Sequence, residues 1–167
     1  MTTRDLSVGF RVSEEFITDN PGIDASAVEV AINFMAASEL ASARTESLLA
    51  PFGLSRGGFN LLTVVAGAEG PLTPTQLGER IIARGATITG LVDTLVRRGY
   101  AERAPDPHDR RRVLVSITPL GRKVITEATA VILRGDEEVM GIFSAAERER
   151  LTRMLGRLQS QLKKLAT

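Results

Sequence analysis

The sequence predicts a mainly helical α+β fold, because two kinds of apolar spacing divide its 167 residues. Through most of the chain apolar side chains recur three or four positions apart, as they do along one face of a helix. Between 100 and 117 the spacing falls to two, with Val113, Val115 and Ile117 on one side, as expected of a strand. A turn at 105–109, which contains two prolines, separates this strand from the one before it. Two short helices followed by such a hairpin form a winged helix-turn-helix.

The two short helices directly precede the hairpin. Thr73 can cap the first, Pro74 suits its first position because proline lacks an N–H, and Gln76 can complete a capping box. The second should run from about residue 85 to 98, with an apolar stripe buried against the rest of the domain. Gly99 then provides a stop, because glycine tolerates the left-handed backbone that ends many helices.

The opposite face of this second helix carries small side chains. Ala86, Thr87, Thr89 and Gly90 allow close approach to a base-pair edge or a phosphate, and threonine can hydrogen-bond a base or contact the thymine methyl group. Asp93 lies near the same side. An ordinary solvent-facing surface is the alternative, and small residues alone do not exclude it.

Longer helices are predicted on both sides of this centre. Caps at Asp24, Ser55, Thr118 and Ser144 should start helices that run to about residues 50, 68 and 140 and into the C-terminal region. The last of them carries leucines alternately four and three apart, the pattern of a helix that packs on a partner helix. Residues 1–23 have no clear pattern, and a loosely ordered arm and a docking segment explain them equally well.

The terminal helices offer more apolar surface than a small winged helix can cover. We therefore expect the termini to intertwine with those of a second copy, although an intramolecular three-helix bundle is the alternative. The expected divisions of one compact chain are an N-terminal arm and dimerisation helix (1–50), the winged helix-turn-helix (51–118) and C-terminal dimerisation helices (119–167). The residues expected at the dimer interface are Val28, Ile32, Met35, Leu151, Leu155, Leu158, Leu162 and Leu165.

Charge is unevenly distributed along the chain. The net charge is only +1, but residues 80–112 hold eight arginines and four acidic residues, whereas the remainder has a net charge of −3. A basic centre in an acidic chain fits a module that contacts DNA. Plain charged surface explains such a cluster about as well.

Other function classes find little support in the sequence. The absence of cysteine excludes disulfides, cysteine nucleophiles and cysteine-based zinc sites. The only histidine, His108, falls on a predicted turn, and the Gly57-Gly58 pair lacks the spacing of a phosphate-binding loop. We expect no catalysis, cofactor or metal. No stretch has the length and apolarity of a membrane span, and the first residues do not form a signal peptide, so we expect a soluble cytoplasmic protein.

The arginines at the hairpin tip are the feature of the sequence that most strongly indicates contact with DNA. Arginines at such a tip can enter a narrow A·T-rich minor groove, where negative potential is concentrated. Asp109 is an unexpected residue to present to phosphates, so we expect it to pair with a neighbouring arginine, most plausibly Arg111, and to fix the tip. A solvated turn with a local ion pair is the alternative.

Several motifs together resemble the MarR family of bacterial transcriptional regulators. They are ATITGLVDTL at 86–95, RGYAER at 98–103, DPHDRR at 106–111 and ITPLG at 117–121, and the resemblance extends over about residues 25–165. It implies a homodimer with intertwined terminal helices that binds a near-palindromic operator in double-stranded DNA. It also implies a repressor of nearby genes that a small aromatic or anionic effector releases, without identifying the effector-binding residues.

By position, the resemblance implies a set of DNA contacts. Ala86, Thr87 and Thr89 would face the major groove, Arg98 and Arg103 would lie near the DNA backbone, Asp109 and Arg111 would be the wing pair, and Arg110 or Arg112 would reach the minor groove.

The chain departs from the family pattern just before the second helix. Arg84 stands where many relatives have a serine cap, and Ile82 where many have a glycine. Arg84 could bind phosphate directly. The competing function is a winged helix used for nonspecific DNA packaging or protein–protein contact, which excess competitor DNA would distinguish from sequence-specific binding.

Overall fold

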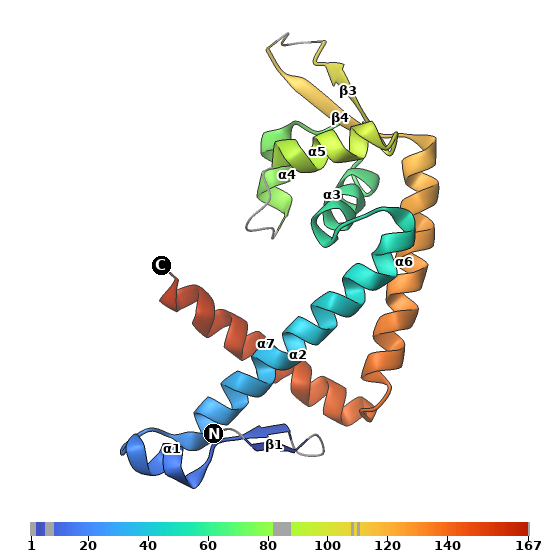
Figure 1. Ribbon diagram of the computed structural model, residues 1–167. Helices are drawn as coiled ribbons and strands as arrows, with labels where there is room; N and C mark the ends of the chain where they lie inside the picture. Colours follow the sequence, from blue (N-terminus) through green and yellow to red (C-terminus); the bar gives the residue numbers. More distant parts are fainter. Residues whose placement is uncertain (1–2, 6–8, 82–87, 108, 110, 167) are drawn as a thin grey trace.

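The computed structural model of the protein describes residues 3–5, 9–81, 88–107, 109 and 111–166, and Figure 1 shows its arrangement. Helices dominate, and the strands form two small antiparallel hairpins, β1–β2 and β3–β4. In chain order the elements are β1 (Thr3–Asp5), β2 (Gly9–Arg11), α1 (Glu14–Asp19), α2 (Ala25–Leu49), the 3₁₀ turn η1 (Ala50–Phe52), α3 (Arg56–Ala66), α4 (Pro74–Arg80), α5 (Ile88–Arg97), β3 (Ala101–Pro105), β4 (Val113–Ile117), α6 (Pro119–Met140) and α7 (Ala145–Leu165).

The molecule has a compact winged end and a long helical stem. Helices α3, α4 and α5 and the β3–β4 hairpin form the winged end, from which α2 and α6 extend (Figure 1). Every buried apolar residue of the described chain lies between residues 49 and 128, so the core belongs to the winged end and to the adjoining turns of α2 and α6. The largest fully buried side chains are Leu49, Leu61, Leu62, Leu77, Val92, Leu95 and Val115.

The predicted capping box of the first short helix is present. The Thr73 side chain accepts a hydrogen bond from the Gln76 backbone N–H, and the Gln76 side chain accepts one from the Thr73 N–H at 2.9 Å. The described part of the second helix begins at Ile88, so its predicted start near residue 85 lies outside the described residues. It ends at Arg97, and Gly99 follows with the left-handed φ of +72° that the stop requires.

The sequence predicts the two strands of the wing at residues 100–104 and 112–117, and the structure has them at 101–105 and 113–117. Its register pairs Ala101 with Ile117 and Pro105 with Val113. Leu72 adds a bridge to Val115, with two backbone hydrogen bonds of 2.8 and 3.0 Å, and this places Val115 in the core. Val113 is exposed, because the wing continues beyond the helices that would cover it. The predicted one-sided alternation is therefore buried only near the base of the wing.

The stem helices contact each other through a glycine. A Cβ built on Gly135 would lie 2.7 Å from Leu48 Cδ1, so the missing side chain lets α6 pack closely on α2. Arg44 and Glu138 add an ion pair between the same helices. Helix α7 follows after a turn at Gly141–Phe143 and crosses the direction of α2 (Figure 1). None of its residues is buried.

The N-terminal segment is a docked arm. A hairpin of β1 and β2 and the short helix α1 pack at the N-terminal end of α2 (Figure 1), and Asn33 of α2 exchanges hydrogen bonds with the Phe10 backbone. For residues 9–12, the contacts with α2 agree with the docking segment, one of the two explanations that the sequence left open.

Among the described residues, no single helix is both long and apolar enough to cross a membrane. The bent pair formed by Ala25–Phe52 and Arg56–Ala66 passes that test together, by length and composition only.

Candidate nucleic-acid interface

The second helix of the pair, α5, has one buried face and one exposed face. Leu91, Val92 and Leu95 are buried in the core, beside α3. The close approach is possible because Gly57 of α3 has no side chain, as a Cβ there would lie 3.2 Å from Leu91 Cδ2. Thr89 remains exposed on the other side of α5. The helix therefore has a face available for a groove of DNA.

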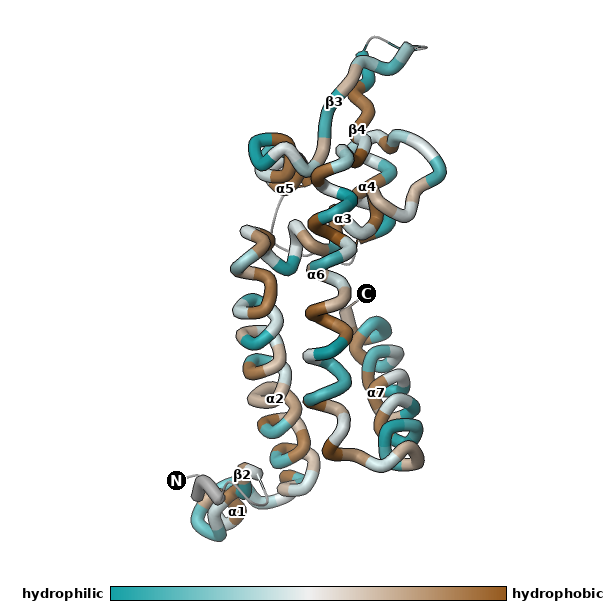
Figure 2. Tube along the Cα trace, turned by 90° about the vertical axis from the view of Figure 1, so that its right-hand side faces the viewer, coloured by the Kyte–Doolittle hydropathy of each residue, from teal (hydrophilic) through white to brown (hydrophobic). Residues whose placement is uncertain are grey.

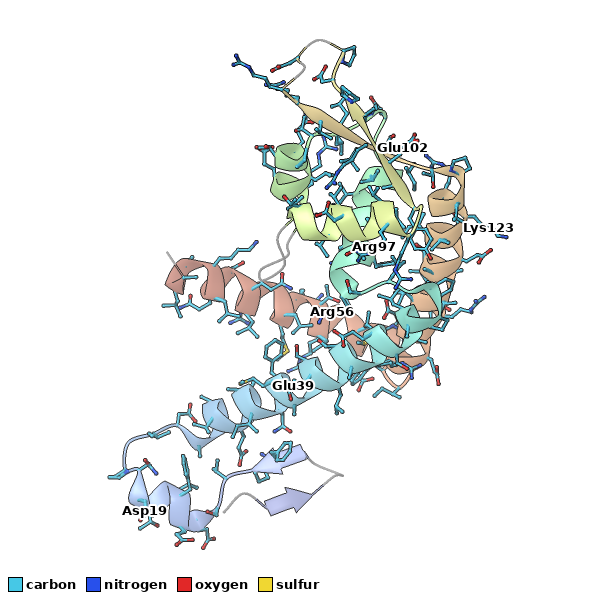
Figure 3. All side chains as sticks on the ribbon, turned by 45° about the horizontal axis from the view of Figure 1, so that its top comes forward. Asp19, Glu39, Arg56, Arg97, Glu102 and Lys123 are labelled. Atoms are coloured by element: carbon cyan, nitrogen blue, oxygen red, sulfur yellow. The ribbon has the colours of Figure 1, made fainter. Side chains whose placement is uncertain are left out.

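The exposed face of α5 continues toward its C-terminal end. Gly90 and Asp93 are exposed, and Arg97 lies on the same side by helical spacing (Figure 3). The Arg97 guanidinium donates to the Thr94 hydroxyl at 3.2 Å, and that hydroxyl donates to the Gly90 carbonyl at 3.0 Å. Sequence reasoning assigned no DNA contact to Arg97. Arg97 lies seven residues, or about two helical turns, after Gly90, and this spacing places both residues on the same face of α5.

Several predicted contacts lie outside the described residues. These are Arg84, Ala86 and Thr87, which precede α5, and Arg110 at the wing tip. Their predicted roles stay predictions.

An ion pair joins the recognition face to the wing. Arg103 Nη1 of β3 lies 2.5 Å from Asp93 Oδ1 of α5, and both side chains are only partly exposed. The predicted position of Arg103 near the DNA backbone is untested, but its guanidinium already has an anionic partner within the chain. This pair fixes the base of the wing relative to α5. Because ten residues separate Asp93 from Arg103, no local sequence pattern predicts this ion pair.

Arg98 occupies the junction between the stem and the winged end. Its guanidinium packs on Gly53, where an added Cβ would lie only 1.9 Å from Nη1. The Tyr100 hydroxyl donates to the Phe52 carbonyl at 2.9 Å in the same region. The Arg98 side chain thus lies beside Gly53, and its predicted contact with the DNA backbone stays a prediction.

Asp109 organises the described part of the wing tip, but with a different arginine from the one predicted. Its carboxylate accepts from the Arg111 backbone N–H at 3.0 Å, and its ion pair is with Arg112 Nε at 3.5 Å. Asp109 thus pairs with a neighbouring arginine as expected, but the side chain in the pair is that of Arg112, and the contact with Arg111 is through its backbone. An aspartate at a turn commonly accepts a hydrogen bond from the backbone N–H two residues later. Here the side chain of Arg112, three residues after Asp109, also folds back toward the carboxylate. The Arg111 side chain is left exposed at the tip.

The predicted dimer residues lie outside the core. Val28 and Ile32 of α2 and Leu155 of α7 are half-buried, whereas Met35 is 67% exposed and Leu165 is 75% exposed. Leu151 and Leu158 are half-buried and Leu162 is exposed. The structure leaves these apolar side chains outside the core, and their place at a dimer interface stays a prediction.

Comparison with known proteins decides the family. The sequence model described as the MarR family matches residues 52–112, which contain the helix pair, the first strand of the wing and the wing tip. The transcriptional repressor YetL of Bacillus subtilis is 30% identical over 141 residues, which are 84% of each chain. The chain belongs to the MarR family. It is accordingly a DNA-binding transcriptional regulator with a helix-turn-helix, and regulators of this family are not enzymes.

Solved structures share the MarR fold with this chain. The MarR family regulator Sco5413 of Streptomyces coelicolor is 25% identical, with a TM-score of 0.70, covering 84% of this chain and 98% of its own. A mutant of Escherichia coli MarR in complex with operator DNA has a TM-score of 0.67 at 22% identity, covering 87% and 99%. The mainly helical fold with a β-hairpin wing is thus confirmed.

Proposed function

We propose that this MarR family regulator acts as a homodimeric repressor of genes near its operator. The observation that carries the proposal is the apolar surface that the folded chain leaves on its stem. Val30, Met35 and Leu40 of α2 and Leu162 and Leu165 of α7 are each more than half exposed. Burying such side chains contributes roughly 1.5–3 kcal/mol each. A second copy offers the same surfaces in return.

Two winged ends related by a two-fold axis would bind the two halves of a near-palindromic DNA site. Recognition helices in such dimers lie about 34 Å apart, one turn of the duplex. We propose that Ala86, Thr87, Thr89 and Gly90 face the major groove and that the arginines of the wing tip reach the adjacent minor groove. The exposed face of α5 supports the first assignment and the exposed Arg111 supports the second.

Repression fits the relative YetL, whose name describes a transcriptional repressor. Relief by a small aromatic or anionic ligand is the part of the proposal that rests on family resemblance alone. Benzoate, as a simple aromatic anion, is a suitable first probe. A repressor of this kind should lose operator affinity as benzoate is raised, whereas unchanged affinity would count against this ligand class.

The decisive experiment is selection of bound fragments from the source genome with the purified full-length chain. Recovered fragments should share a near-palindrome, and binding to them should survive an excess of random competitor DNA. A nonspecific packaging protein would recover no shared sequence, and the competitor would displace it.

A further inference from the structure

Tyr100 is tied to the C-terminal end of α5. It is the only tyrosine in the sequence, and it follows Gly99, whose left-handed φ of +72° ends the helix. The Tyr100 N–H donates to the Leu95 carbonyl at 2.9 Å. The Gly99 N–H donates to the Val96 carbonyl, also at 2.9 Å. These bonds close the last turn of α5, so the position of Tyr100 is fixed relative to this helix.

The backbone of Tyr100 is also tied to the first turn of α6. Its carbonyl accepts a hydrogen bond from the Thr118 N–H at 3.1 Å, and the Thr118 hydroxyl donates to the neighbouring Gly99 carbonyl at 2.6 Å. Gly121 permits this approach, because a Cβ there would lie 1.9 Å from the Tyr100 carbonyl oxygen. The end of α5 is thus held against the start of the stem helix α6 (Figure 1).

The side chain of Tyr100 reaches the other stem helix. Its hydroxyl donates to the Phe52 carbonyl at 2.9 Å, in the 3₁₀ turn η1 that directly continues α2. The ring is half-buried and packs against the core. Because the hydroxyl adds no apolar burial, what its hydrogen bond supplies is a fixed position of the α5 end relative to α2.

One residue therefore connects α5 to both stem helices, and the stem carries the surfaces of the proposed dimer. In a two-fold dimer, the separation of the two recognition helices depends on the angle between each α5 and its own stem. One base pair changes the separation of two half-sites by about 3.4 Å and their relative rotation by about 35°. A small change in this angle would therefore change which spacing of half-sites fits the dimer.

We propose that Tyr100 is a positioning residue that restricts the dimer to one spacing of operator half-sites. Its hydroxyl holds the end of α5 at a defined angle to the stem, and it acts through α5 rather than by touching DNA. The inference rests on the proposed homodimer and adds to it a residue that selects the spacing.

The test compares three duplexes, the selected operator and two derivatives with one base pair inserted or deleted at its centre. The full-length wild-type chain should bind the operator at least about tenfold more tightly than either derivative, because the DNA must deform to fit the changed spacing. Tyr100→Phe keeps the ring and should reduce that ratio of affinities by about two- to tenfold, the factor that corresponds to the net contribution of one hydrogen bond. Fluorescence anisotropy titrations measure each affinity.

Thr126→Val is the matched control. The Thr126 hydroxyl also donates to a backbone carbonyl, but that carbonyl belongs to Arg122 of the same helix, α6. Its removal leaves the junction between α5 and the stem as it is, so the ratio of affinities should stay at the wild-type value. Circular dichroism of both variants checks that the fold is retained.

The outcomes separate the role of Tyr100 from the proposed function. If Tyr100→Phe keeps the wild-type ratio, with or without an equal loss of affinity for all three duplexes, the hydroxyl only stabilises the fold. That result would overturn the inference and leave the homodimer intact. A wild-type chain that binds all three duplexes equally, or none of them, would overturn the binding of one dimer to two half-sites and the inference with it.

Discussion

At the scale of single residues, the surface that we propose faces DNA carries arginines in two different environments. Arg103 and Arg112 each have an aspartate partner in the same chain, Asp93 and Asp109. Arg111 is exposed at the tip of the wing. Paired arginines can fix geometry, whereas an exposed one can neutralise phosphate charge, so their substitutions should have different signatures.

Salt dependence should separate the two kinds of arginine. Arg111→Ala should lower the slope of log affinity against log salt by about one unit, because one phosphate neutralisation is lost. Arg103→Ala should lower operator affinity without changing that slope, because it disturbs the wing position through Asp93. Titrations at several salt concentrations measure both. A reduced slope for Arg103→Ala would show that Arg103 contacts phosphate itself.

Base preference should depend on the exposed face of α5. Thr89→Ala should weaken binding to the selected operator by about 5- to 150-fold, equivalent to about 1–3 kcal/mol, with little effect on random duplex. Thr63→Ala is the control, because that threonine is also exposed on a helix and its hydroxyl donates only to its own helix, at the Phe59 carbonyl. Equal losses on both duplexes would remove Thr89 from base recognition.

At the scale of elements, the chain relies on glycines where backbones approach closely. A Cβ on Gly121, in the first turn of α6, would lie 1.9 Å from the Tyr100 carbonyl oxygen. Because that contact is with backbone, neither side can move cheaply. The start of α6 is thereby fixed against the beginning of the wing.

Two matched glycine substitutions test this contact. Gly121→Ala should destabilise the fold by at least about 1–3 kcal/mol, the cost typical of overpacking. Gly156→Ala, in a helix with open space around the site, should stabilise it by roughly 0.5–1 kcal/mol. Chemical denaturation measures both, and a neutral Gly121→Ala would contradict the close contact.

The stability that the N-terminal cap of α2 contributes to the fold should decrease in acid. The hydrogen bond from the Ser26 hydroxyl, with backbone N–H groups, lowers the pKa of Asp24. A carboxyl whose pKa is depressed in the fold contributes stability above its unfolded pKa, and this is lost as pH falls through the folded value. Asp24→Asn should therefore flatten the acid limb of the stability profile. An unchanged limb would mean that the cap contributes nothing to it.

Elements with local signals were predictable, and contacts between distant residues were not. The Thr73–Gln76 capping box lies within four residues, and its helix was expected at the right place. The docking of Phe10 on Asn33 joins residues 23 apart and has no periodic pattern. At the site, the exposure of Thr89 followed from helical spacing, whereas the Asp93–Arg103 pair depends on how the wing folds back on α5.

At the scale of the whole molecule, the core and the apolar surface are separate. The buried side chains gather at the winged end, and the stem and α7 carry exposed ones. Figure 2 shows apolar residues at intervals along α2 and α7, outside the winged end. A monomer would leave that stem incomplete, whereas a dimer would cover it and hold two winged ends on one face of a duplex.

The most direct test is the mass of the complex between the full-length chain and one operator duplex, by sedimentation velocity. The duplex is taken from the genome selection, and a shuffled duplex of equal length and composition is the control. Our account predicts two chains on one operator and no stable complex with the shuffled duplex. One chain per operator, or equal binding to both duplexes, would contradict it.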